Sequence, residues 1–303
     1  MKTISMKHPL LASLLCVGGL VLVSFLIIFT YAHRNELKNM SFVQASSQKS
    51  VQKASQQKLI CLIDSYPSRF PKQIDIITKT WAKRCDYAYI ISTVANETKG
   101  FNVIEYKGED SDHWGKVMVS LDYVYNNYID KIDWVLKTSD EVFTIPENLH
   151  YFINSKKLKS SDPLWFGSEY LSPSKSVFMS REGYVMSKAA VVKLMTEGKK
   201  LPKDKCKTQE HQLNEEDELA KCLKALDVKT VDTRDQLGRH RFISYDLGEM
   251  IIPVSDPNKR EKRLRFPYQN GPNCCAQDPI LLKGGSIRFF DFMLYELHYA
   301  GEK

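Results

Sequence analysis

Residues 133–144 read DWVLKTSDEVFT and decide the fold, because a short apolar run ends there in a group of polar side chains. Val135 and Leu136 are too few for a helix, so the pattern predicts a buried strand. Ser139, Asp140 and Glu141 follow it directly. Open α/β sheets bind ligands outside the carboxyl ends of their strands, and two adjacent carboxylates there suit a divalent cation that carries phosphate oxygens. The same residues are equally typical of a solvated turn after a strand.

The segments on both sides of this strand predict an alternation of strands and helices. The predicted strands span residues 59–63, 87–92, 102–106 and 163–167. The predicted helices span residues 72–83, 114–128 and 189–195, and another begins at Pro146, since proline is accepted in the first helical turn. Strand, helix and strand at this spacing indicate βαβ units and a largely parallel sheet. The sequence therefore predicts the α/β class.

The N-terminal part of the chain is predicted to be a membrane anchor and a stem. Residues 10–32 form the one long apolar run. A bilayer span needs about 20 apolar residues, whereas a cleaved signal peptide has an apolar region of about 7–15, so we expect a retained transmembrane signal anchor. Lysines and arginines on its two sides are nearly balanced and fix no orientation. Residues 1–9 form a tail, residues 33–58 a flexible stem rich in Ser, Gln and Lys, and residues 59–303 one folded domain.

The cysteine content indicates an oxidising compartment. The 303-residue chain has 7 cysteines and a formal net charge of +7. Cys16 lies in the apolar run, and an even number remains for disulfides, with 15 possible connectivities. These are Cys61, Cys85, Cys206, Cys222, Cys274 and Cys275. None has the spacing of a zinc site, no nucleic-acid-binding motif accompanies the basic residues, and Asn96-Glu97-Thr98 is a glycosylation sequon.

Four short motifs in fixed order resemble one family. They read TWAKRC at 80–85, DWVLK at 133–137, GYVMSK at 183–188 and GPNCC at 271–275. Together they are similar to the core 1 β1,3-galactosyltransferases, a Fringe-like family, over about residues 59–299. The resemblance implies a single GT-A type, Rossmann-like glycosyltransferase domain in the lumen of the Golgi or ER, on a single-pass type II anchor. It also implies inverting transfer from UDP-galactose to O-linked GalNAc on glycoproteins, and the pairs Cys61–Cys85, Cys206–Cys222 and Cys274–Cys275.

The resemblance also implies site residues. The family carries three consecutive aspartates where this chain has Ser139, Asp140 and Glu141, so Asp140 and Glu141 are expected to hold Mn²⁺. Ser139 and Asp140 are also expected to contact the donor, as are two residues from the family's Trp-Lys pair. These are Lys116, in the family register, and Trp114, displaced by one residue because Gly115 fills its place.

The general base is expected in the segment 214–222, which resembles a family motif that carries a catalytic aspartate. Counting back from Cys222 places Glu216 at that position, and Asp217 is one residue away. Either carboxylate could serve if it reaches the acceptor hydroxyl. The alternative is purely structural: acidic residues favour a helix N-terminus, with Asn214 as its cap.

Two departures from the family pattern leave other functions open. Arg181-Glu182 replaces a pair of glycines, and no histidine lies between Cys275 and His298 to complete the metal site. Lys283 or Gly284 falls nearest that histidine, so a lysine could supply a fixed charge and make the activity metal-independent. The family also includes a chaperone of the core 1 galactosyltransferase, which shares the short glycine segment. An inactive chaperone is therefore the alternative, with a homodimer or a heteromer with a related transferase as possible assemblies, and a lectin-like module is a third.

Overall fold

The computed structural model describes residues 57–69, 72–94, 101–246, 263–269 and 271–283, all within the unit that begins at Gln57. The predicted tail, anchor and nearly all of the stem lie outside these residues, as do Asn96 and Gly284. No helix of the described part is long and apolar enough to cross a membrane.

The main sheet has seven strands and is mixed. They are β1 (Leu59–Asp64), β2 (Tyr87–Ser92), β3 (Val103–Glu105), β4 (Trp134–Ser139), β6 (Leu164–Leu171), β7 (Val177–Ser187) and β8 (Lys229–Thr230). Their order is β3-β2-β1-β4-β7-β6-β8. β1 runs parallel to β2 and β4, and β2 parallel to β3, which confirms the predicted α/β class and its parallel βαβ units. β7 is antiparallel to both β4 and β6, so the sheet is less parallel than predicted.

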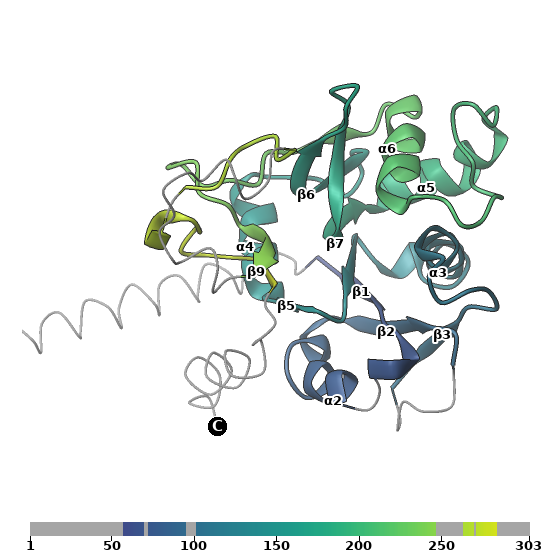
Figure 1. The fold of residues 1–303 in the computed structure, drawn as a ribbon, viewed down its shortest axis with the longest axis horizontal. Coiled ribbons are helices and arrows are strands. Elements are labelled where there is room, and N and C mark those ends of the chain that lie inside the picture. The colour runs from purple at the N-terminus through teal and green to yellow at the C-terminus, as the bar shows by residue number, and fades with distance from the viewer. Residues whose placement is uncertain (1–56, 70–71, 95–100, 247–262, 270, 284–303) are drawn as a thin grey trace, which may run out of the picture. The chain divides into compact units, whose positions relative to one another are not determined.

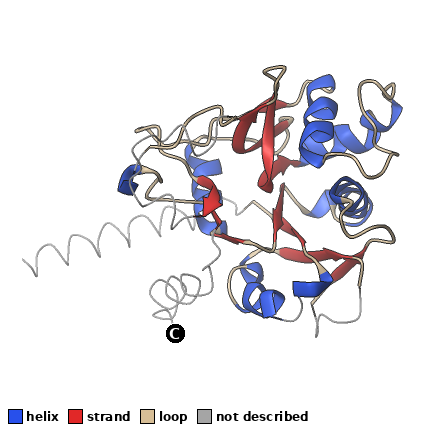
Figure 2. Ribbon diagram, viewed as in Figure 1, coloured by secondary structure: helices blue, strands red, loops and turns tan. Residues whose placement is uncertain are grey.

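Helices cover both faces of this sheet (Figures 1 and 2). They are α2 (Lys72–Lys79), α3 (His113–Asn127), α4 (Pro146–Ser155), α5 (Lys188–Thr196) and α6 (Glu215–Ala225). One core cluster joins α3, α5 and α6 to Ile60 and Leu62 of β1, and a second joins α2 and α4 to Leu59, Cys61 and Ile63. Successive strand residues point to opposite faces, so β1 is apolar throughout because both of its faces are buried. Single 3₁₀ turns lie at Pro67–Arg69, Ala82–Arg84, Ile129–Lys131, Gly198–Lys200 and Gly271–Asn273.

Local sequence explains where several helices begin. The Asp112 carboxylate accepts from the Gly115 amide (2.9 Å) and caps α3, and Ser187 caps α5 through the Ala190 amide (3.1 Å). Asn214 accepts from the Asp217 amide (2.9 Å), so the segment 214–222 does begin a capped helix, α6. Pro146 occupies the first turn of α4, as predicted.

A second, three-stranded sheet brings the C-terminal part of the described chain to the acidic segment. Its strands are β5 (Val142–Thr144), β10 (Leu281–Lys283) and β9 (Phe242–Asp246), in the order β5-β10-β9. β10 is antiparallel to β5 and parallel to β9. The register pairs Lys283 with Val142, the residue after Glu141. This pairing places Lys283 beside Glu141, although the two residues are far apart in the sequence.

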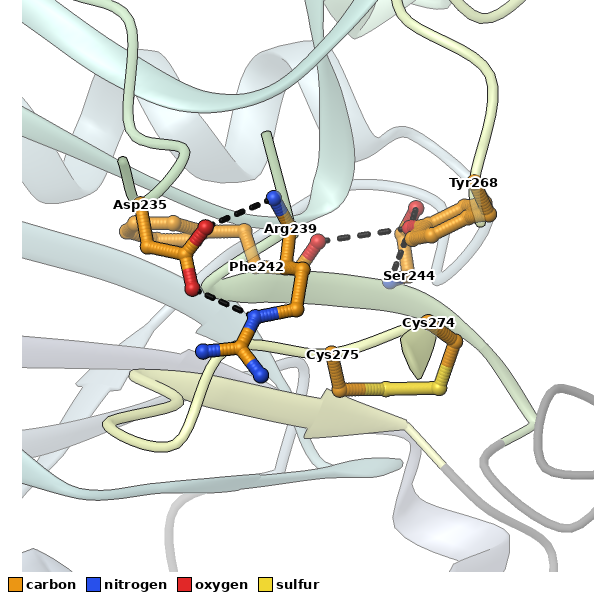
Figure 3. Close-up of a disulfide and its surroundings, with 7 residues drawn as sticks. All are labelled: Asp235, Arg239, Phe242, Ser244, Tyr268, Cys274 and Cys275. Carbon is orange, nitrogen blue, oxygen red and sulfur yellow. Dashed lines mark hydrogen bonds and ion pairs between the residues drawn. A yellow bond between two sulfur atoms is a disulfide. The ribbon is translucent and has the colours of Figure 1, made fainter. Parts of the chain in front are cut away.

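Three disulfides join the cysteine pairs that the family resemblance implies. Cys61–Cys85 spans 24 positions, Cys206–Cys222 spans 16, and Cys274–Cys275 links adjacent residues. Figure 3 shows the last of these beside β9 and Tyr268, whose hydroxyl donates to the Phe242 carbonyl (3.3 Å) and accepts from the Ser244 amide (3.2 Å). The Tyr268 hydroxyl therefore ties the segment 263–269 to β9, whereas the disulfide joins only adjacent residues.

His240 next to this disulfide is expected to make stability depend on pH. The side chain is 4% exposed, its ring centroid lies 4.2 Å from that of Tyr268, and burial lowers its pKa to about 4. Below pH 6.5 the His240 imidazole takes up a proton in the unfolded state, whereas in the folded state it does so only near pH 4. Stability is therefore lost as the pH falls through this window. The loss from this group is about 3 kcal/mol, at about 1.4 kcal/mol per pKa unit.

Urea unfolding of the purified protein at several pH values between 7 and 4 measures this loss. His240→Phe keeps a ring against Tyr268 but cannot take up a proton, so the variant is expected to lose about 3 kcal/mol less over the same range. Equal pH dependence of the two proteins would show that His240 is not responsible.

Candidate active site

A polar cavity of about 300 Å³ opens at the carboxyl ends of β1 and β4. The last residues of these strands, Asp64 and Ser139, are paired in register and both line it. The chain builds the sheet outward from β1 to β3 and then returns to β4 on the other side of β1. Such a reversal of strand order is where α/β sheets bind ligands. The cavity lies at the place that the acidic segment predicted.

Arg69 joins the two acidic residues that follow β4. Asp140 is 1% exposed, and its Oδ1 lies 2.5 Å from Arg69 Nη1, while its Oδ2 accepts from the Ser65 hydroxyl (2.6 Å). Glu141 Oε1 lies 2.7 Å from Arg69 Nη2. Burial raises the pKa of Asp140 above its usual value, against the opposing effects of Ser65 and Arg69. The Arg69 guanidinium therefore pairs with both carboxylates.

Lys283 extends this arrangement to Glu182 on β7. Its ammonium pairs with Glu182 Oε1 and lies 3.5 Å from Glu141 Oε2. Ser139 Oγ donates to Glu182 Oε2 (2.8 Å). Burial alone would raise the pKa of Glu182, but Lys283 and Ser139 hold it below its ordinary value. We call the resulting row of alternating charges the charge chain: Asp140, Arg69, Glu141, Lys283 and Glu182.

The predicted metal ligands do not fit Mn²⁺ in this arrangement. A divalent ion needs free carboxylate oxygens. Asp140 and Glu141 instead share the Arg69 guanidinium, and the ammonium of Lys283, one of the two residues nearest the family's histidine in the sequence, lies 3.5 Å from Glu141 Oε2. Protein cations thus already neutralise the two carboxylates that would hold the ion.

A different group, Asp64, His113 and Glu215, could hold a metal ion, since its ligand atoms lie within 4.8 Å of one another. His113 Nδ1 lies 2.7 Å from Asp64 Oδ2. Each carboxylate, however, also contacts a lysine: Lys116 Nζ lies 3.2 Å from Asp64 Oδ1, and Lys137 Nζ lies 2.8 Å from Glu215 Oε1. A metal ion would have to compete with both ammonium groups.

These buried lysines belong to a network that fixes the base of the cavity. Lys137 of β4 is 1% exposed and pairs with Glu215 of α6, which also accepts from the Tyr184 hydroxyl of β7 (3.0 Å). Burial would raise the pKa of Asp64, but the hydrogen bond from His113 and the charges of Lys137 and Lys116 lower it to about 2. The network ties α6 to the sheet beside the cavity.

Two predicted donor contacts lie in the protein interior. Lys116 is fully buried and pairs with Asp110 (2.8 Å) as well as Asp64, so it acts beneath the cavity rather than lining it. Trp114 is also fully buried, belongs to the core, and donates its indole N–H to the Lys207 carbonyl (3.1 Å). The prediction that Trp114 contacts the donor is corrected here, because the side chain packs in the core. No side chain fits at Gly115 either, since a Cβ there would lie 2.1 Å from the Tyr106 hydroxyl.

The structure separates the two candidate bases. Glu216 accepts from the Arg181 amide (2.9 Å) and lines a second cavity of about 300 Å³, which shares Glu182 and Lys283 with the first. Asp217 lines a different groove, of about 610 Å³, between α6 and the β6–β7 turn. Only Glu216 of this pair lies beside the charge chain.

Comparisons with known proteins give no family. No family model matches the chain. A solved structure of galactosyltransferase LgtC in complex with donor and acceptor sugar analogues is 9% identical and covers 75% of this chain and 87% of its own, with a TM-score of 0.37. The 4-diphosphocytidyl-2C-methyl-D-erythritol synthase of Anaerococcus prevotii is 11% identical and covers 57% of this chain and 85% of its own, with a TM-score of 0.35. Similarity at this level does not establish a shared function.

Proposed function

We propose that this protein is a GT-A type glycosyltransferase that transfers galactose from UDP-galactose to O-linked GalNAc of glycoproteins with inversion, from a type II anchor in the Golgi or ER membrane. The observation that carries the proposal is the polar cavity at the β1–β4 reversal, which is lined by four carboxylates and four cationic side chains and adjoins a second cavity that contains Glu216. The cations are Arg69, Lys137, Arg181 and Lys283. Cations of this kind stabilise a leaving diphosphate.

The two adjoining cavities suggest how the reactants would meet. The nucleoside diphosphate would lie against the cations of the first cavity, and the acceptor sugar would enter the second, which has the aromatic side chains of Tyr170, Phe178 and Tyr245. The acceptor hydroxyl would attack the anomeric carbon as the bond from that carbon to the diphosphate oxygen breaks. Its proton would pass to Glu216, which the Arg181 amide holds in place. The diphosphate would leave from the opposite face of the sugar, which gives inversion.

A transfer assay tests this function. The full-length protein in detergent is incubated with UDP-galactose and a peptide that carries one O-linked GalNAc, with and without Mn²⁺. Mass spectrometry is expected to show a product heavier than the peptide by one hexose, and the proton coupling at its anomeric carbon, measured by NMR, is expected to show the β linkage. If neither this donor nor other UDP-sugars give any product under either condition, the proposed activity is wrong.

The neutralised acidic cluster favours a second candidate, the inactive chaperone of a core 1 galactosyltransferase. Asp140 and Glu141 are both ion-paired, and Glu182 extends into the cavity where the family has glycine. Co-expression with a core 1 galactosyltransferase distinguishes the two functions. The chaperone function predicts more active partner enzyme, and no effect of substitutions in the charge chain that leave this protein folded. The transferase function predicts product from this chain alone.

A further inference from the structure

The charge chain lies where the resemblance implies a metal ion, and its cations come from parts of the sequence that the acidic motif does not contain. Resting on the proposed function, we propose that Arg69 and Lys283 are a built-in substitute for that ion, and that this site binds a nucleoside diphosphate without a divalent metal. The two side chains would neutralise and orient the phosphates, as a metal ion otherwise does in such sites.

Arg69 is suited to this role by its position and chemistry. Its guanidinium is held by Asp140 and Glu141 on one side, lies 4.9 Å from the centroid of the Tyr66 ring, and remains 35% exposed at the cavity. A planar guanidinium offers several N–H donors and binds phosphate through two parallel hydrogen bonds. The two carboxylates therefore orient a cation that can still reach a ligand.

Lys283 provides the second positive charge. It is 29% exposed, lines both adjoining cavities, and contacts Glu141, which also binds Arg69. Glu141 thus binds both cations. Its Oε1 lies 2.7 Å from Arg69 Nη2, and its Oε2 lies 3.5 Å from Lys283 Nζ. A diphosphate bound there would meet a guanidinium and an ammonium from two different elements.

Glu182 gives the inference its sharpest test, because its carboxylate competes with a bound anion. It pairs with Lys283 and accepts from Ser139, and it is an additional negative charge in the cavity wall. If Arg69 and Lys283 bind the diphosphate, removing this charge strengthens binding. If a divalent metal binds it instead, removing a nearby carboxylate weakens binding, because a potential ligand is lost.

Calorimetric titration of UDP into the full-length protein, with all divalent metal removed by chelation, tests the inference. Saturable binding is expected, with a dissociation constant that changes less than about twofold when Mn²⁺ is added. Arg69→Gln and Lys283→Gln are each expected to weaken binding by about 10–100-fold, the value of a hydrogen bond between charged groups. Glu182→Gln is expected to strengthen it several-fold. Lys79→Gln, which removes an exposed lysine outside the cavity, is the matched control and is expected to leave binding unchanged.

The outcomes separate this inference from the proposed function. Binding that requires Mn²⁺, or weaker binding in Glu182→Gln, overturns the inference that Arg69 and Lys283 replace the metal ion. It does not overturn the proposed glycosyltransferase function. No binding of UDP with or without Mn²⁺ overturns both. Thermal melting of each variant shows whether it is folded. If Arg69→Gln is not folded, the metal-free titration of the unaltered protein and of Lys283→Gln still tests the inference.

Discussion

Replacing Lys137 with methionine is expected to lower the free energy of unfolding by about 3–5 kcal/mol, because it leaves a buried carboxylate without its partner. Lys137 and Glu215 are 1% and 3% exposed, and they lie 2.8 Å apart between β4 and α6. Burial already raises the pKa of Glu215 against the effect of Lys137, so without the lysine this side chain must take up a proton or leave the interior. If Glu215 leaves the interior, it displaces the first turn of α6, which also carries Glu216.

Urea unfolding of the Lys137→Met variant and two matched variants measures this effect. In Lys137→Met/Glu215→Gln both charges are gone, and most of the lost stability is expected to return. Lys188→Met removes a lysine that is 34% exposed and pairs with the exposed Asp130, so a change within about 0.5 kcal/mol is expected. A loss below about 1 kcal/mol in Lys137→Met would contradict the role of this pair.

Glu216→Gln is expected to reduce the rate of sugar transfer by about 10²–10⁴-fold, the usual contribution of a general base. The amide cannot take the proton of the acceptor hydroxyl, yet it keeps the shape of the side chain and can still accept from the Arg181 amide. Because Glu216 is outside the first cavity, the affinity for UDP is expected to stay within about twofold of the unaltered protein.

Asp217→Asn is the matched control, since the two carboxylates are adjacent in sequence but line different cavities. The rate of transfer is expected to change less than about twofold in this variant. The comparison uses kcat for transfer to the GalNAc peptide. A large loss in Asp217→Asn with little change in Glu216→Gln would assign the base to the other residue and contradict the geometry.

The local sequence predicts an element well where its own residues carry the signal, such as a continuous apolar run or a proline in the first turn of a helix. The apolar run at the start of the domain forms β1, and Pro146 opens α4. The direction of β7 could not be predicted from its residues. An apolar strand can pair in either direction, and β7 is set by its long hairpin with β6 and by its pairing with β4.

The acidic segment identified the place of the cavity, but not the residues that surround it. Arg69 ends the 3₁₀ turn Pro67–Arg69, and it meets Asp140 across 71 positions of sequence. Lys116 and Lys137 are buried because partners elsewhere in the chain neutralise them, and no local pattern predicts such pairing. Asp64 was within reach of sequence reasoning, since it directly follows the predicted strand 59–63, which lies next to β4, and the carboxyl ends of parallel strands meet at one edge.

Hydrogen–deuterium exchange of the full-length protein with saturating UDP-galactose tests most directly whether the cavity at the β1–β4 reversal is the nucleotide-sugar site. We predict slower amide exchange in the segments 64–69 and 139–142 on addition of the ligand, and less protection of these segments in Arg69→Gln. Protection confined to the groove between α6 and the β6–β7 turn, or none at all, would contradict the proposed site.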